Sequence, residues 1–376
     1  MKIITILLGL FALSIVAFST APAMMQTATT FDLEVIDYTG LQVVNARDMP
    51  PKGLKRYEID HRHTPVIRVQ PGEKFVVITE DAMDGNLLVD GRYTKIPKEL
   101  EVYKHDPPHY NPSGGPIYIE GCTKNDVVAV KIHSVKPAEY GFTARIPDGL
   151  EEHYLLRKYP QLDKPAVYEI KHLPGPSGTT RDGVAVYGKY KWDLDPYIGT
   201  LTLAPEREVK STLLVRGKYG GNLDVRDVKQ GSTFYVNSYN EGGLLYAGDC
   251  HASQADTEYF GFADECRCEY VLSVELIKDK RLPHPRIKTR DGRLVGLCES
   301  GNGMMAIGEA RLNLFQWLVE DYGCDPADLY ALMAVAEPFR VEYYQGPGAG
   351  NSWGVQTVGW SVHESFIQGK GWKRMP

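Results

Sequence analysis

The sequence predicts a mainly β fold, sandwich- or barrel-like, with a C-terminal α/β portion, so that the protein is α+β overall. Short β-branched runs separated by turn residues follow one another up to about residue 300. The chain also contains 37 Gly, 24 Pro and 23 Tyr, a composition that favours turns and strands over long helices. Helical spacing of apolar residues appears only after these runs.

Five runs carry the strand signature, a short β-branched stretch bounded by turn residues. They are Lys74–Thr79, Pro116–Glu120, Asp126–Ile132, Ser232–Val236 and Tyr270–Leu276. In the last run, positions 271, 273 and 275 (Val, Ser, Glu) alternate with positions 272, 274 and 276 (Leu, Val, Leu). This alternation is typical of a sheet with one solvated face. These runs predict the main strands of the sheet.

Two helices are predicted late in the chain. Residues 306–322 place apolar side chains at helical spacing, and Gly323 follows where a C-terminal cap is expected. Asp325 and Pro326 then supply an N-cap and a first-turn proline for a second helix over 329–335. The pair is expected to cover one side of the sheet.

The first residues have the layout of a signal peptide. Lys2 precedes an uncharged apolar run over 3–18, and the small residues 20–23 end it with an Ala-Pro-Ala cleavage site. This pattern predicts a secreted or periplasmic protein that has no membrane association after cleavage. We expect a signal peptide over 1–23, a β-rich N-terminal domain over 24–190, and a β-rich core with the helix pair over 191–376, packed as one catalytic unit.

Composition narrows the classes of partner. The formal net charge of −6 disfavours nucleic acid and anionic membrane surfaces. An oxidising compartment permits disulfides among the six cysteines, and one or two are expected, although spacing leaves their pairing open.

The densest polar segment is 248–258, which follows the apolar stretch 244–247. Asp249, His251 and Glu258 there offer oxygen ligands and one imidazole at the rim of a sheet. Zinc accepts such a mixture, and calcium accepts its oxygen part. The alternative interpretation is a solvated loop with an Asx turn.

Two further segments are candidates for the same chemistry. Asn222 and Asp224 follow a Gly-Gly pair and share one face if the chain is extended, although a hairpin turn explains this segment equally well. Asp84 lies in an acidic turn after a predicted strand, where it either binds a metal or solvates a loop. No Gly-x-Ser-x-Gly elbow is present, and Cys250 and His251 are adjacent on a strand and so face opposite sides.

Several of these segments, in this order, resemble motifs of the acetamidase/formamidase family over roughly residues 65–365. Residues 111–121 (NPSGGPIYIEG) resemble its N-P-x-x-G-P-x-x-x-E-G run, and 219–224 (YGGNLD) resemble H-G-G-N-M-D. Residues 231–236 (GSTFYV) look like its G-S-x-L-x-x strand, and 248–258 (GDCHASQADTE) resemble G-D-G-H-A-A-Q-G-D-G-E. The helix at 328–335 is also similar to the family's final helix.

The resemblance implies an exported, metal-dependent amidohydrolase, active on a small linear amide such as formamide or acetamide and assembled as a homo-oligomer. The expected cofactor is a divalent metal, zinc or alternatively calcium, that activates water. Its ligands or ligand-orienting groups would be Asp84, Asn222, Asp224, Asp249 and His251.

The resemblance also suggests the proton-transferring groups. Glu120 or Glu258 is the expected base, and Tyr219 stands where the family has His and would donate its phenol to the carbonyl oxygen. Cys250, Ala255 and Thr257 replace glycines of the family motif, which is expected to narrow the pocket. The alternatives are a non-catalytic exported binding protein that retains the fold, and a hydrolase of a cyclic or larger amide.

Overall fold

The computed structural model describes residues 38–47, 55–95, 109–145, 157–162, 164–258, 261–346, 355–369 and 371. Residues 36–376 form one compact unit by their contacts. The predicted boundary at 190/191 falls within β12 (Tyr190–Asp193), which pairs with β11 (Val184–Tyr187) as an antiparallel hairpin. The division at 190/191 stays a prediction, and the expected signal peptide lies outside the described residues.

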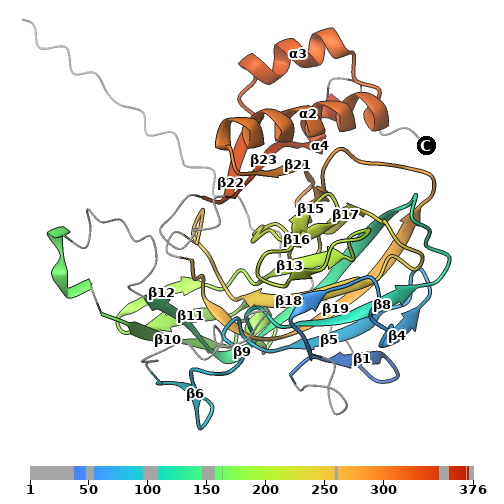
Figure 1. Cartoon of the computed structure of the whole chain (residues 1–376). Helices are drawn as coiled ribbons and strands as arrows, with labels where there is room; N and C mark the ends of the chain where they lie inside the picture. Colours follow the sequence, from blue (N-terminus) through green and yellow to red (C-terminus); the bar gives the residue numbers. More distant parts are fainter. Residues whose placement is uncertain are drawn as a thin grey trace, which may run out of the picture. The chain divides into compact units, whose positions relative to one another are not determined.

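The predicted fold class is confirmed: strands are the commonest element of the described chain, and the long helices come late (Figure 1). Nineteen of the described strands connect in one mixed sheet. Besides β11 and β12 they are β1 (Gln42–Asn45), β2 (Lys55–Arg56), β4 (Ile67–Val69), β5 (Phe75–Thr79), β8 (Ser113–Ile119), β9 (Val127–Arg145), β10 (Ala166–Leu173), β13 (Tyr197–Leu203), β15 (Arg216–Gly217), β16 (Gly220–Asn222), β17 (Thr233–Asn237), β18 (Leu245–His251), β19 (Glu265–Ile277), β20 (Arg286–Lys288), β21 (Arg293–Ser300), β22 (Arg340–Gln345) and β23 (Gln356–His363).

Smaller elements complete the described chain. Two short antiparallel strand pairs stand outside the main sheet: β3 (Glu58–Ile59) pairs with the sequence-distant β14 (Lys210–Ser211), and β6 (Leu88–Val89) forms a hairpin with β7 (Arg92–Tyr93). Two 3-10 turns lie at Pro160–Leu162 and Thr180–Asp182.

Two long strands form the backbone of the main sheet. β9 and β19 pair antiparallel from Phe142↔Glu265 to Val127↔Ile277. Their alternating apolar residues face a large buried cluster, to which β5, β13, β17 and β18 also contribute. Burial of such a cluster stabilises the fold in proportion to the apolar area removed from water. The five predicted strand runs are confirmed, and β9 extends well beyond its predicted end.

β18 occupies a central place in the pairing. It pairs antiparallel with β13, with β8 and, at its C-terminal end, with β19. β13 in turn pairs with β16 through Thr200↔Asn222. These pairings bring together residues that are more than a hundred positions apart in sequence.

The predicted helix pair is confirmed. α2 (Gly303–Tyr322) is capped by the side chain of Asn302 and ends at Gly323, whose φ of 66° is left-handed. α3 (Pro326–Val335) begins after its N-cap Asp325, whose carboxylate accepts from two backbone N–H groups. α2 packs on β21 and β23, as Figure 1 shows, and a short α4 (Glu364–Gly369) follows.

The six cysteines are free thiols in this structure, so the expected disulfides are not present. Cys250 and Cys266 are partners across β18 and β19, with their Sγ atoms 3.6 Å apart. Cys250 thus faces the core and away from His251, as the alternation along a strand predicts.

None of the helices in the described residues is long and apolar enough to cross a bilayer.

Candidate active site

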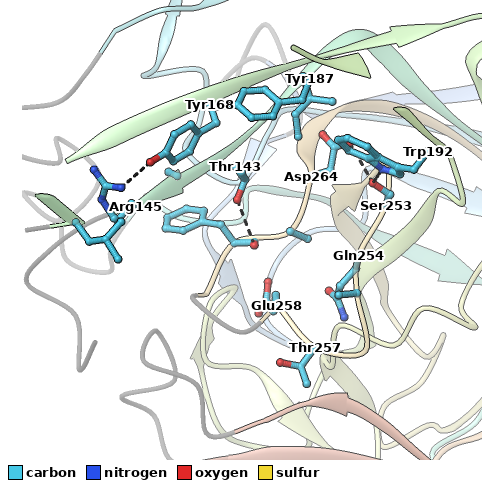
Figure 2. Close-up of a pocket in the computed structure, with 16 residues that line it drawn as sticks. Thr143, Arg145, Tyr168, Tyr187, Trp192, Ser253, Gln254, Thr257, Glu258 and Asp264 are labelled. Carbon is cyan, nitrogen blue, oxygen red and sulfur yellow. Dashed lines mark hydrogen bonds between the residues drawn. The ribbon is translucent and has the colours of Figure 1, made fainter. Parts of the chain in front are cut away.

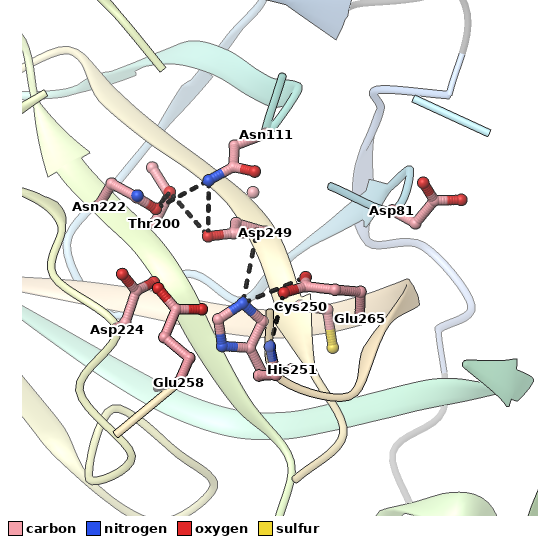
Figure 3. A network of polar contacts seen from close by, with 12 residues as sticks. Asp81, Asn111, Thr200, Asn222, Asp224, Asp249, Cys250, His251, Glu258 and Glu265 are labelled. Atoms are coloured by element: carbon pink, nitrogen blue, oxygen red, sulfur yellow. Dashed lines mark hydrogen bonds and ion pairs between the residues drawn. The ribbon is translucent and has the colours of Figure 1, made fainter. Parts of the chain in front are cut away.

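A buried polar cluster surrounds His251 at the end of β18 (Figure 3). Ligand atoms of Asp224, Asp249 and His251 lie within 4.8 Å of one another, and those of His251, Glu258 and Glu265 do likewise. These five residues are called the His251 cluster below. β18 supplies two of them, β19 supplies one, and the segments after β16 and β18 supply the others, so the cluster depends on the pairing of the whole sheet.

The backbone around the cluster is strained. Asp224 and Asp249 have φ values of 51° and 58°, and neighbouring Asn111 has 47°. Residues other than glycine rarely adopt this left-handed region, and such strain persists where the surrounding structure requires it. Backbone strain of this kind clusters at functional sites.

Buried oxygen acceptors around His251 lack hydrogen-bond donors. They are Asp224 Oδ1, Asp249 Oδ1, Glu265 Oε2 and the side-chain Oδ1 of Asn111. Each such atom costs free energy when it is removed from water without a partner. His251 Nε2 lies 3.4 Å from Asp249 Oδ1 and 3.2 Å from Glu265 Oε2. An imidazole nitrogen among unpartnered carboxylate oxygens matches the donor set of a divalent cation.

Asn222 and Asn111 orient the cluster. Asn111 Nδ2 donates to Asn222 Oδ1 and to Asp249 Oδ2, each at 3.0 Å. Thr200 Oγ1 also donates to Asn222 Oδ1, at 2.6 Å. Since Asn222 Oδ1 already accepts two hydrogen bonds, Asn222 acts as a positioning residue for Asp249 through Asn111.

The ring of His251 is fixed by a second hydrogen-bonded chain. The Tyr197 hydroxyl contacts both His251 Nδ1 and Gln254 Oε1. Gln254 Nε2 donates to Tyr344 O at 3.1 Å, so its Oε1 is the atom that faces Tyr197. The Tyr197 hydroxyl has one proton and gives it to Gln254 Oε1. His251 Nδ1 therefore donates to the Tyr197 oxygen, and Nε2 is the ring atom directed at the carboxylates.

Gln345 joins the two acidic parts of the cluster. Its Nε2 donates to Asp224 Oδ2 and, at 2.9 Å, to Glu258 Oε1. Its Oε1 accepts from Arg216 Nη2 at 3.1 Å. A single amide therefore fixes the separation of Asp224 and Glu258 and links them to a buried guanidinium.

The cluster carries more acid than base. Burial, followed by the charges of neighbouring acids, raises the pKa of Asp224 well above its usual range and also raises that of Glu258. Burial raises the pKa of Glu265 to about 7. For His251, burial lowers the pKa, but the charges of Glu265, Tyr197 and Asp249 outweigh it and raise the pKa well above 6.5. All of these pKa values are raised because the buried site holds more acidic groups than positive charges.

Gly199 on β13 leaves the space in which two carboxylates meet. A Cβ at this position would lie 2.6 Å from Asp249 Oδ2 and 2.9 Å from Asp224 Oδ1. Real Cβ atoms do not approach other atoms this closely, so the carboxylates hold their places only because position 199 lacks a side chain.

The structure brings together five of the residues predicted from sequence and not the other three. Asn222, Asp224, Asp249, His251 and Glu258 meet in or beside the cluster. Two segments, 222–224 and 249–258, thus meet at one site, whereas the acidic turn that contains Asp84 does not join them.

Glu120, Asp84 and Tyr219 have other partners. Arg68 Nε donates to Glu120 Oε1 at 2.6 Å in a partly exposed ion pair. Asp84 accepts from Tyr57 OH at 2.6 Å and pairs with Lys55. The Tyr219 ring packs edge-on to Tyr239, with centroids 6.1 Å apart. Among the described contacts, none joins these three residues to the His251 cluster.

Other members of the site were not identified from the sequence. Asn111 begins the matched Asn-Pro motif, and that position was the available signal. Glu265 precedes a strand that was predicted only from residue 270, and Gln345 carries no motif. Thr200 and Tyr197 read as ordinary strand residues, since only the pairing of β13 with β16 and β18 places them here.

A cavity of about 770 Å³ opens beside the cluster (Figure 2). Glu258 and Gln254 line it, so this cavity and the His251 cluster share Glu258. Ala255 and Thr257, which replace glycines of the family motif, also line the cavity.

Comparisons with known proteins point to one family. Residues 206–340 match the model of the Acetamidase/Formamidase family. An acetamidase structure from Yersinia enterocolitica is 28% identical, with a TM-score of 0.71, over 87% of this chain and 93% of that one. No curated protein matches.

Two more distant structures share the fold. The acetamidase from Bacillus halodurans is 22% identical over 87% of this chain and 99% of that one, and a predicted acetamidase/formamidase from Thermoanaerobacter tengcongensis is 20% identical over 88% and 98%. Both have a TM-score of 0.71.

Proposed function

This chain is a relative of the acetamidase/formamidase family, and from that premise we propose that it is a metal-dependent hydrolase that converts an amide to a carboxylate and ammonia. The observation that carries the proposal is the set of buried, donorless oxygens around His251. Burying such acceptors without donors costs free energy, and a cation bound between them would remove that cost.

Asp224, Asp249 and His251 are the residues that would hold the cation. Glu265, with its unpartnered Oε2, is the fourth candidate. When bound, a divalent cation supplies Lewis-acid polarisation of a carbonyl oxygen and lowers the pKa of water. The mixture of one imidazole with carboxylates suits zinc, whereas calcium would use the oxygens alone, so zinc is the metal that we propose.

Glu258 is the proposed proton carrier. It is the acid of the cluster that also lines the cavity, so it can meet substrate and attacking water. Its Oε1 is held by Gln345, and Oε2 is the atom that we assign to proton transfer. Burial raises its pKa, which favours accepting a proton from water and returning it to the leaving nitrogen near neutral pH.

The remaining residues position these groups. Tyr197 holds the ring of His251, Asn111 holds Asp249, and Gln345 holds Asp224 with Glu258. Such preorganisation reduces the entropy that the reaction must otherwise lose. Tyr219, which is packed against Tyr239, takes no part in this proposal.

The test combines metal analysis with turnover. The purified protein is expected to contain close to one divalent ion per chain by elemental mass spectrometry. It should release ammonia from an amide, lose this activity with a chelator and regain it with zinc. A protein that binds metal but cleaves no amide would favour the alternative of a non-catalytic binding protein, and a protein without metal would reject the proposal.

We further propose that the protein is exported and self-associates. The charged start, apolar run and small residues of 1–23 support export. N-terminal sequencing of the mature protein should begin near residue 24, and sedimentation should give a mass above that of one chain. An uncleaved cytoplasmic monomer would contradict both parts.

A further inference from the structure

We propose that the amide cleaved at this site carries an aromatic ring on its acyl side, as in a primary arylacetamide, and that this ring occupies the cavity beside Glu258. The inference rests on the proposed amide hydrolysis and adds a substrate class to it. The observation behind it is the size and lining of the cavity.

The cavity is far larger than acetamide. Its volume is about 770 Å³, whereas a molecule of four non-hydrogen atoms occupies on the order of 100 Å³ at ~30 Å³ for each water-sized group. Pockets of ~300–1,000 Å³ hold ligands the size of a drug molecule. An acetamide at Glu258 would leave most of this space to water.

Aromatic side chains form much of the cavity wall. Trp192, Tyr168, Tyr187 and Phe262 all line it. The rings of Tyr168 and Tyr187 meet edge to face, with centroids 6.0 Å apart. A flat aromatic group gains from such walls both through burial of apolar area and through ring–ring geometry, which adds ~0.5–1.5 kcal/mol for a pair.

The charged groups of the wall, apart from Glu258, already have partners. Arg145 donates to Tyr168 OH at 2.6 Å and to a backbone carbonyl. Asp264 lies 3.2 Å from His172 Nε2 and accepts from Ser253 at 3.2 Å. Since these groups are engaged with each other, the lining favours an uncharged ring over a charged acyl group.

The arrangement also sets the direction of the substrate. Figure 2 shows Glu258, Gln254 and Thr257 on one side of the cavity and Tyr168, Tyr187 and Trp192 on the other. The carboxamide therefore faces Glu258, where the His251 cluster lies, and the ring extends towards the aromatic wall. A substrate with a short link between ring and carboxamide spans these two sides.

The experiment compares phenylacetamide with acetamide in the metal-loaded full-length protein. We expect kcat/KM for phenylacetamide to exceed that for acetamide by at least about tenfold, which corresponds to ~1.4 kcal/mol. Ala255→Phe, which fills the cavity from its exposed side, should lower the ratio of kcat/KM for phenylacetamide to kcat/KM for acetamide at least about tenfold. Trp192→Ala should also lower this ratio of kcat/KM values. Ala334→Phe, an exposed helix position remote from the cavity wall, is the matched control and should leave the ratio unchanged.

Each outcome decides the inference. If acetamide is cleaved as well as phenylacetamide, or if Ala255→Phe leaves the ratio unchanged, the aromatic substrate class is rejected and amide hydrolysis stands. If no amide is cleaved, a calorimetric measurement of phenylacetamide binding distinguishes the proposed aromatic ligand from the proposed amide hydrolysis. Binding that Ala255→Phe abolishes supports the aromatic ligand while hydrolysis fails, and no binding overturns both.

Discussion

Two acidic regions of this protein look alike in sequence and differ in what surrounds them. In the turn after β5, which contains Glu80, Asp81 and Asp84, every carboxylate oxygen accepts a hydrogen bond. Arg267 binds Glu80, Tyr93 and two backbone N–H groups bind Asp81, and Lys55 with Tyr57 binds Asp84. In the His251 cluster, three buried carboxylate oxygens accept none.

The difference shows which property marks a cation site. Both regions are rich in Asp and Glu, so acidity alone does not separate them. The turn supplies its own cations and donors and is complete without a ligand. The His251 cluster has more buried acceptors than donors, and that imbalance is what a divalent ion would correct.

Substituting one acid in each region gives the largest contrast. Asp249→Asn is expected to lose the bound metal and at least about 100-fold in amide turnover, because even outer partners of metal ligands contribute 10–100-fold. Asp84→Asn should keep metal content and turnover. Elemental analysis and ammonia release measure both. Similar losses in the two variants would remove the distinction between the regions.

The pH dependence of stability tests the acidic turn. Burial, followed by the charge of Glu80, raises the pKa of Asp81 to about 7. Because the folded state holds this proton more tightly than the unfolded state, the contribution of Asp81 to stability is greatest below about pH 4 and is lost as the pH rises to about 7. The loss attributable to Asp81 is at most about 4 kcal/mol.

Urea unfolding at several pH values measures this contribution. The difference in unfolding free energy between wild type and Asp81→Asn should change across the pH window from about 4 to about 7. Two curves that stay parallel through this window would contradict the assignment.

Metal removal should destabilise only the protein with an intact cluster. A ligand present at 100 times its dissociation constant stabilises the folded state by about 2.7 kcal/mol. A chelator is therefore expected to lower the unfolding temperature of the wild type and to leave that of Asp249→Asn unchanged. Thermal denaturation with and without added zinc measures the shift. An equal shift in both proteins would locate the stabilising ion elsewhere.

The smallest expected effect comes from Gly199. Gly199→Ala pushes against Asp249 and Asp224, so we expect metal affinity to fall about tenfold, or ~1.4 kcal/mol. Gly308→Ala on α2, where a Cβ meets no atom within 4 Å, is the matched control and should leave affinity unaltered. Metal titration of both variants gives the comparison, and equal affinities would show that the carboxylates tolerate displacement.

The sequence predicted the strands and helices better than it predicted the site. Strand runs such as 270–276 and the capped helix over 306–322 are determined by local periodicity and turn residues, which a sequence displays directly. Asp224, Asp249 and His251 were found because each lies in a motif that resembles the family. The pairing of β13 with β16 and β18 is what brings these three side chains together.

The remaining site residues depend on long-range pairing. Gln345 reaches Asp224 across 121 positions, and Asn111 reaches Asp249 across 138. The sequence around these residues contains no motif that predicts either hydrogen bond. Asp84 was named as a candidate because it lies in an acidic turn after a strand, and Glu120 because it lies in a motif that resembles the family. Lys55 and Arg68 bind them instead, and those partners are also distant in sequence.

Gln345, the last residue of β22, has a consequence for how the protein is made. Its amide joins Asp224 and Glu258, so the site is incomplete until nearly the entire polypeptide has left the ribosome. A nascent chain stopped before β22 would hold two buried acids with no amide between them. Catalytic competence therefore arises late in synthesis, and a fragment that ends before Gln345 should not possess it.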